Sequence, residues 1–167
     1  MVDLGSNIPN QRIMDTLMQV SDPEIPVLTI VDMGIVKRLE LDGKDLHIDI
    51  IPTYTGCPAM DTIAMDIRTA LEGLGYNVHV NLKLHPAWTT DMISEEGKSR
   101  LEEYGIAAPL ESSMDKRALL DGEKIVKCTN CGSSNTSLVS HFGSTPCKAL
   151  FKCDDCLEPF DYFKCLS

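Results

Sequence analysis

Seven cysteines are the residues of this sequence best suited to react or to bind metal. The first of them, Cys57, is separated in sequence from the other six, which all follow residue 127. It follows an apolar run at 46–51 that is typical of a strand, and it precedes Pro58 and apolar residues at helical spacing. Proline is well tolerated as the first helical residue, so we expect Cys57 at a strand-to-helix turn beside the positive end of the helix dipole. That position favours the thiolate, which attacks electrophiles and binds soft metals. A small buried cysteine that happens to precede a helix is the alternative.

Four more cysteines form two C-x-x-C pairs, Cys128 with Cys131 and Cys153 with Cys156. Each pair places two sulfurs side by side in one turn. Two such turns together supply the four thiolates that surround a metal ion as a tetrahedron. A segment of about forty residues buries too little surface to fold alone, so we expect the metal to staple it. Four thiolates favour zinc, but they also suit a rubredoxin-type iron or an iron–sulfur cluster.

The two remaining cysteines have no such partner in the sequence. Cys147 lies between the pairs, and Cys165 lies near the C-terminus. Each is either a spare buried thiol or an alternate ligand that would make the metal site exchangeable. The four lysines and four acidic residues after residue 125 balance, so we expect this ribbon to dock a protein or to be structural rather than to bind nucleic acid.

Composition limits the classes of protein to which the chain can belong. Its 167 residues suit one ordinary domain and a small module, and its formal net charge of -10 argues against a nucleic-acid partner. No stretch is long and apolar enough to cross a bilayer, and the first residues lack the layout of a secretion signal. We therefore expect a cytoplasmic protein without a membrane partner, in which cysteines bind metal rather than form disulfides.

The elements that must position Cys57 follow from periodicity. We expect helices at 10–19, at 58–71 and at 94–104, and strands at 35–41, 46–53 and 77–84. Asp42-Gly43 is a strong signal for a hairpin between the first two strands. In the third strand, the alternation predicts one buried face made of Val78, Val80, Leu82 and Leu84.

These elements predict an α/β fold, a small mixed three-stranded sheet with helices on one face, followed by a metal-stapled zinc-ribbon module. The hairpin is antiparallel, and the strand–helix–strand unit after it allows a parallel, right-handed crossover. We expect an α/β domain at 1–105, a linker at 106–125 and the ribbon at 126–167. Sites in such sheets form where strand ends meet helix N-termini, as at Cys57.

A loop rich in proline and carboxylates lies upstream of the sheet. Asp22-Pro23-Glu24-Ile25-Pro26 cannot continue a helix, because it contains two prolines. Its two carboxylates are therefore held in a stiff loop. Ordinary turn formation by aspartate before proline is the alternative to a functional role.

Several of these segments together carry a resemblance to a known family. The segments are 22–26, Thr53, Gly56-Cys57-Pro58 and 86–92 in the first module, and 142–145, 147–150 and 158–165 in the ribbon. The first module resembles the iron–sulfur-assembly-associated domains, and the whole chain resembles the phenylacetate-degradation protein D type. That type is a small accessory subunit encoded with the phenylacetyl-CoA oxygenase, or epoxidase.

The resemblance implies a reactive Cys57 flanked by Asp22 and Thr53, and a role in maturing iron–sulfur or related metalloenzymes. Its clients would be oxygenase or reductase subunits, since the oxygenase uses a di-iron subunit and a reductase with a [2Fe–2S] cluster. Cys57 would hold iron or a cluster transiently. One cysteine cannot hold a cluster alone, so a homodimer, a client ligand, Cys147 or Cys165 must supply further ligands.

Two other functions remain open at this stage. A cysteine-nucleophile enzyme acting on a thioester or disulfide would need a base, for which His47 and His85 are the candidates. A permanent structural subunit of the oxygenase complex, bound through the ribbon, is the other. The sequence leaves the ribbon metal, the oligomeric state and the identity of the client undetermined.

Overall fold

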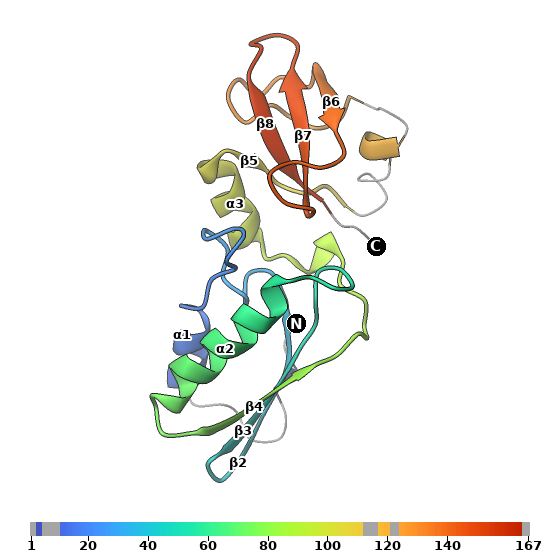
Figure 1. Ribbon diagram of the computed structural model, residues 1–167. Helices are drawn as coiled ribbons and strands as arrows, with labels where there is room; N and C mark the ends of the chain where they lie inside the picture. The colour runs from blue at the N-terminus through green and yellow to red at the C-terminus, as the bar shows by residue number, and fades with distance from the viewer. Residues whose placement is uncertain (1–2, 5–10, 112–116, 121–123, 165–167) are drawn as a thin grey trace. The chain divides into compact units, whose positions relative to one another are not determined.

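A computed structural model describes residues 3–4, 11–111, 117–120 and 124–164 (Figure 1). Contacts within the chain divide it into two compact units, Met1–Trp88 and Thr89–Ser167. The sequence led us to expect the first domain to extend to residue 105. The division lies earlier because the helix after Trp88 leads directly into a strand that pairs within the second unit.

The first unit is built on a four-stranded sheet in the order β1-β2-β3-β4. The strands are β1 (Asp3–Leu4), β2 (Val36–Asp42), β3 (Asp45–Ile50) and β4 (Asn77–Leu82). β2 and β3 form the expected antiparallel hairpin, with Gly43 in the left-handed conformation at its turn, and β4 lies parallel to β3. The predicted three-stranded sheet is therefore confirmed, and β1 extends it by a short strand parallel to β2.

Two helices cover one face of this sheet, as Figure 1 shows. They are α1 (Gln11–Leu17) and α2 (Ala59–Glu72); α2 packs on β4, and α1 packs on α2. Ile63, Ile67 and Leu71 recur every four residues on α2 and are fully buried. They pack toward the face of β3 formed by Leu46, Ile48 and Ile50, which are buried as well.

The predicted buried face of the third strand is correct only for its first half. Val78 is 8% exposed, but Leu82 and Leu84 are 54% and 58% exposed, and Leu84 lies beyond the end of β4. Strict alternation reports which side chains share a face, but it does not report where the covering helix stops. The far end of β4 therefore projects beyond the apolar layer.

The second unit contains its own four-stranded sheet, in the order β5-β8-β7-β6. Its elements are η1 (Thr90–Met92), α3 (Glu95–Tyr104), β5 (Ile106–Ala107), β6 (Thr136–Ser140), β7 (Lys148–Cys153) and β8 (Pro159–Phe163). Ser94 caps α3 by accepting the N–H of Gly97, and Gly105 ends it in the left-handed conformation, so the helix lies where it was expected. Phe151, Phe160 and Tyr162 form the aromatic centre of the core.

Within the ranges that the structure describes, no helix combines the length and the apolar composition needed to span a membrane.

Candidate functional site

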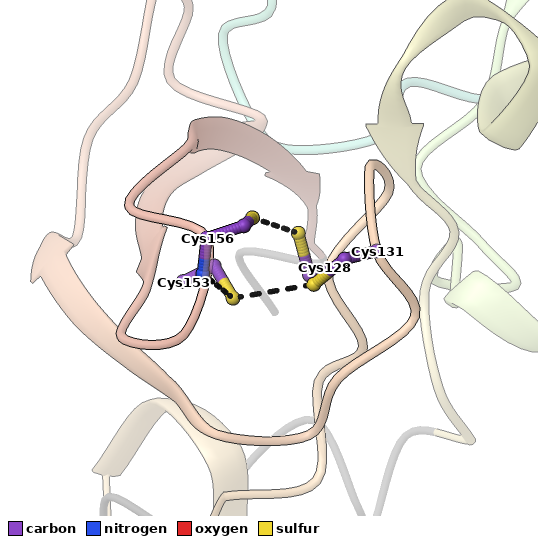
Figure 2. Close-up of side chains that lie close together, drawn as sticks. All are labelled: Cys128, Cys131, Cys153 and Cys156. Carbon is purple, nitrogen blue, oxygen red and sulfur yellow. Dashed lines mark hydrogen bonds between the residues drawn. The ribbon is translucent and has the colours of Figure 1, made fainter.

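The two C-x-x-C pairs meet at one point, as Figure 2 shows. Cys128 and Cys131 lie in the loop before β6, whereas Cys153 ends β7 and Cys156 lies in the turn that follows it. All four sulfurs lie within 4.8 Å of one another. Among the described residues, this is the one group of three or more such side chains whose ligand atoms converge.

The sulfur separations fit a single tetrahedral ion. The Sγ atoms of Cys128 and Cys156 are 3.6 Å apart, as are those of Cys131 and Cys153. A zinc–sulfur bond of about 2.3 Å in a tetrahedron requires sulfurs about 3.8 Å apart. A disulfide would require about 2.05 Å. The four thiols are therefore arranged as ligands of a metal ion rather than as disulfides.

Backbone geometry shapes both turns in the same way. The residue after each pair has a positive φ, 75° at Gly132 and 65° at Leu157. The N–H group that follows each of these residues acts on the second cysteine of its pair, Ser133 on Cys131 and Glu158 on Cys156. Within the pairs, Asn130 N–H donates to Cys128 Sγ, and Cys156 N–H donates to Cys153 Sγ. Such donors stabilise thiolates, which are the form that binds metal.

The four thiols do not share one proton affinity. The backbone N–H of Glu158 is the main cause that lowers the pKa of Cys156 to about 6, with help from Asn130. At Cys131 the Ser133 N–H acts to lower the pKa, but Cys156, burial and the other two thiols together raise it to about 12. Cys156 therefore ionises before Cys131, and a bound cation must displace the proton of Cys131.

Cys147 does not belong to this cluster. It directly precedes β7, whereas Cys153 ends it, and a six-residue strand is about 20 Å long. The Cys147 thiol is buried and lies 3.0 Å from the Thr145 hydroxyl. In this fold Cys147 cannot replace a ligand of the cluster while β7 is intact. Cys165, the other alternate ligand considered, lies outside the described residues.

Cys57 lies where β3 gives way to α2, as the sequence predicts. The Cys57 N–H donates to the Tyr54 carbonyl, and Gly56 has a φ of 82°, which together form a tight turn that needs a glycine-like third residue. Pro58 precedes the helix as its N-cap, with a φ of -69°, and α2 begins at Ala59, one residue later than expected. The thiol is half-buried rather than enclosed.

The electrostatics at Cys57 differ from the sequence-based prediction. Burial raises the pKa of the thiol above its ordinary value, and the Glu24 carboxylate raises it further. The Ala59 N–H at the start of α2 lowers the pKa, and the Tyr54 and Thr53 side chains act in the same direction. The predicted helix effect is thus present but is outweighed by burial. The prediction of a favoured thiolate in the metal-free protein is wrong.

Asp22 and Thr53 occupy different places around this turn. Thr53 is buried and its side chain acts to lower the pKa of the Cys57 thiol. Asp22 is buried in its own loop, where its carboxylate accepts the N–H groups of Glu24 at 2.7 Å and Ile25 at 2.9 Å. Asp22 therefore fixes the loop, and Glu24 is the carboxylate whose charge acts on Cys57.

Sequence reasoning missed two residues at the site, Glu24 and Tyr54. Glu24 was visible only as a loop carboxylate, and Tyr54 only as part of the turn. His47 and His85, the candidate bases for a nucleophilic cysteine, are not among the groups that shift the pKa of the Cys57 thiol. His47 instead stacks on His79 on the open face of the sheet.

Two family models match the chain, one on each module. The model described as iron-sulfur cluster assembly protein matches residues 10–82. The model described as PaaD zinc beta ribbon domain matches residues 112–164. The first contains Cys57 with Asp22 and Thr53, and the second contains all four clustered cysteines.

Sequence relatives cover either the whole chain or its first module. A protein of Escherichia coli, provisionally named as a subunit of 1,2-phenylacetyl-CoA epoxidase, is 49% identical over 90% of this chain and 89% of its own length. A protein of Porphyromonas gingivalis named Fe-S protein maturation auxiliary factor is 36% identical over 54% of this chain and 89% of its own.

One solved structure resembles the first part of the fold. It is a domain of unknown function from Bacillus anthracis, with a TM-score of 0.51 and 27% identity over 55% of this chain and 89% of that domain.

Proposed function

This chain belongs to the PaaD family, and from that premise we propose that it is an accessory maturation factor of a phenylacetyl-CoA epoxidase system. In this proposal it assists the insertion of iron or an iron–sulfur cluster into a client subunit of the oxygenase or its reductase, and Cys57 is the residue that handles the iron. The relatives named as Fe-S maturation factors share the module that contains Cys57 and lack most of the remaining length.

The observation that carries the proposal is the half-buried thiol at the β3–α2 turn. The residue is partly exposed, and Thr53, Tyr54 and the Ala59 N–H act on its thiol. A thiol with a raised pKa and a nearby Glu24 carboxylate remains protonated and unreactive until a cation arrives. Cation binding then removes the proton, which suits transient loading better than a permanently open thiolate would.

We propose zinc as the ribbon metal and a structural role for it. Four thiolates at tetrahedral separation without an open coordination position are typical of structural zinc sites. Six reduced cysteines in the described chain suit a reducing compartment such as the cytoplasm. The stapled ribbon then offers a rigid surface on which a client protein docks.

Anaerobic reconstitution tests the role of Cys57. The full chain is prepared with zinc in the ribbon, supplied with Fe²⁺ and sulfide, desalted, and assayed for iron, zinc and visible absorbance. We expect bound iron in the native chain and in Cys147→Ser, the matched control that removes another thiol. We expect loss of iron in Cys57→Ser at unchanged zinc content.

The same assay can overturn the proposal. Equal iron in the native chain and Cys57→Ser would remove Cys57 from iron handling. Loss of iron together with zinc only in variants of the ribbon cysteines would assign the iron to the tetrathiolate cluster instead.

A second candidate function is a permanent structural subunit of the oxygenase complex. The word subunit in the name of the Escherichia coli relative favours it, as does a ribbon whose metal has no open position. Co-purification with the oxygenase separates the two functions, because a stoichiometric complex that survives dilution favours a structural role, and a transient one favours maturation.

A further inference from the structure

The open face of the first sheet carries only polar side chains, and they are aligned across three strands. Since β2, β3 and β4 pair in register, Glu40, His47 and His79 lie in one row that crosses the strands. The flanking rows contain Asp45 opposite Asn77, and Asp49 opposite Asn81. The described helices of the first unit, α1 and α2, lie on the opposite face of the sheet (Figure 1).

The two histidines are close enough to share a ligand. Their ring centroids are 4.7 Å apart, and the rings are stacked with an angle of 16° between their planes. In-register residues on neighbouring strands are about 4.8 Å apart, so two imidazoles can each place a nitrogen about 2.1 Å from one ion. His47 and His79 therefore lie side by side on the sheet as two potential nitrogen donors, whose rings are stacked rather than already turned toward one ion.

Carboxylates surround this pair. Asp45 Oδ1 lies 3.4 Å from His79 Nε2 and accepts the Asn77 amide at 3.0 Å. Asp49 accepts the Asn81 amide at 3.0 Å, and Arg38 is occupied by Glu40 at 2.6 Å. The local charge thus favours a cation.

We propose that His47, His79 and Asp45 form a surface site for one divalent first-row transition-metal ion. Two imidazoles and one carboxylate suit zinc, iron, cobalt, nickel and copper. The site is independent of the tetrathiolate cluster and of Cys57, since its ligands lie on the open face of the sheet in the first unit.

Binding requires a small rearrangement of side chains that solvent exposure permits. The stacked rings must turn so that one nitrogen of each faces a common point beside Asp45, whose side chain is 51% exposed, as is that of His79. The Asp45–His79 contact then becomes two bonds to the same ion. Water completes the coordination, so metal exchange at this site is fast.

The chain supplies its own control, because it contains four histidines and only two belong to the pair. His85 and His141 are exposed and lie elsewhere. The full chain, with zinc in its ribbon, is titrated anaerobically with Co²⁺, and the imidazole C–H signals are followed by NMR. We expect the signals of His47 and His79 to shift or broaden first, and those of His85 and His141 to change little.

Variants locate the ligands. We expect His47→Thr and His79→Thr each to weaken Co²⁺ binding by at least about tenfold, and Asp45→Asn to weaken it as well, as loss of a ligand should. His85→Thr and Cys57→Ser should bind as the native chain does, which separates this site from the proposed iron handling at Cys57.

Each contrary result overturns the proposal. Equal shifts of all four histidines would show non-specific binding. Unchanged affinity in His47→Thr or His79→Thr would show that the rings only stack, and unchanged affinity in Asp45→Asn would remove the third ligand. An intense thiolate-to-cobalt absorption would show that cobalt had entered the cysteines instead.

Discussion

The charge around Cys57 decides when its sulfur becomes a ligand. Burial and the Glu24 carboxylate both oppose ionisation, whereas the Ala59 N–H, Tyr54 and Thr53 favour it. In the metal-free chain the effects that oppose ionisation are the larger ones. Cys57 therefore holds its proton at neutral pH more firmly than an ordinary thiol does. Glu24 thus restrains reaction with neutral electrophiles and attracts cations.

Alkylation of Cys57 measures this restraint. Because the pKa is raised, the rate of labelling by iodoacetamide should be low at neutral pH and should increase with pH beyond the range of an ordinary cysteine. Glu24→Gln removes a negative charge that raises the pKa, so we expect labelling at pH 7 to become a few times faster, given tenfold for each pKa unit. Peptide mass spectrometry of Cys57 gives the rate.

Glu72→Gln is the matched control for that change. Glu72 ends α2, about 20 Å along the helix from Cys57, so its removal should leave the rate unchanged. Equal rates in the Glu24→Gln variant and the native chain would mean that Glu24 does not act on the thiol.

Asp22 acts on the backbone of its loop. Its buried carboxylate accepts two N–H groups, and Asp22→Ala would leave both without that acceptor. We expect a loss of about 2–3 kcal/mol in the free energy of unfolding, as for buried groups left unsatisfied. Urea unfolding followed by Trp88 fluorescence measures it, because Trp88 is the only tryptophan and is 2% exposed in the first unit. A loss below about 0.5 kcal/mol, as is usual for surface substitutions, would contradict this role.

The turns that contain Cys57 and the two cysteine pairs each include one residue in the left-handed backbone conformation. Gly56 precedes Cys57, and Gly132 and Leu157 follow the two cysteine pairs. A Cβ at Gly56 or Gly132 would meet no atom within 4 Å, so substitution there tests backbone conformation alone.

Gly132→Ala should therefore destabilise the second unit by about 1–2 kcal/mol, the ordinary difference for a left-handed non-glycine residue. Leu157 already has this conformation and is 64% exposed, so Leu157→Gly should be neutral or stabilising. Thermal unfolding of the zinc-loaded chain, followed by circular dichroism, gives both effects. If Leu157→Gly destabilised the second unit more than Gly132→Ala does, the argument that a positive φ favours glycine at these positions would be refuted.

The sequence predicted these elements where local chemistry is decisive. Asp42-Gly43 indicated the hairpin, periodicity indicated the helix at 94–104, and the C-x-x-C spacing indicated the metal cluster. It did not predict the exposure of Leu82 or the charge of Glu24 near Cys57, because both depend on segments distant in sequence. The prediction of a lowered pKa for Cys57 was wrong for the same reason, because the burial that raises this pKa depends on how the whole chain folds.

At the scale of the whole molecule, the metal should be needed for the folding of only one of the two units, the second. The first unit has an extensive apolar core of its own, whereas the second relies on a small aromatic core and the cysteine cluster. Chelation should therefore unfold the ribbon and leave Trp88 fluorescence unchanged. Hydrogen exchange is the complementary readout, and we expect β7 to lose protection while β3 keeps it. A change in Trp88 emission that parallels metal loss would contradict this separation.

Acid should release the metal before it disturbs the rest of the ribbon. Binding requires thiolates, so protons compete with the metal for the four sulfurs and binding weakens as the pH falls. In the metal-free chain the pKa of Cys156 is lowered to about 6. Asp155 has a pKa lowered by hydrogen bonds from Ser133 and Asn135, so its stabilising effect persists until the pH falls below about 4. Metal content measured against pH should therefore fall before Asp155 loses its charge, and full retention of the metal at pH 4 would contradict this order.

The central claim is that Cys57 takes part in loading a client with iron or a cluster. The most direct measurement is the iron–sulfur and iron content of the oxygenase and reductase subunits isolated from cells that contain native chain, Cys57→Ser or Cys147→Ser at equal abundance. We predict depleted clients with Cys57→Ser and full loading with the other two. Fully loaded clients in the presence of Cys57→Ser would contradict the account.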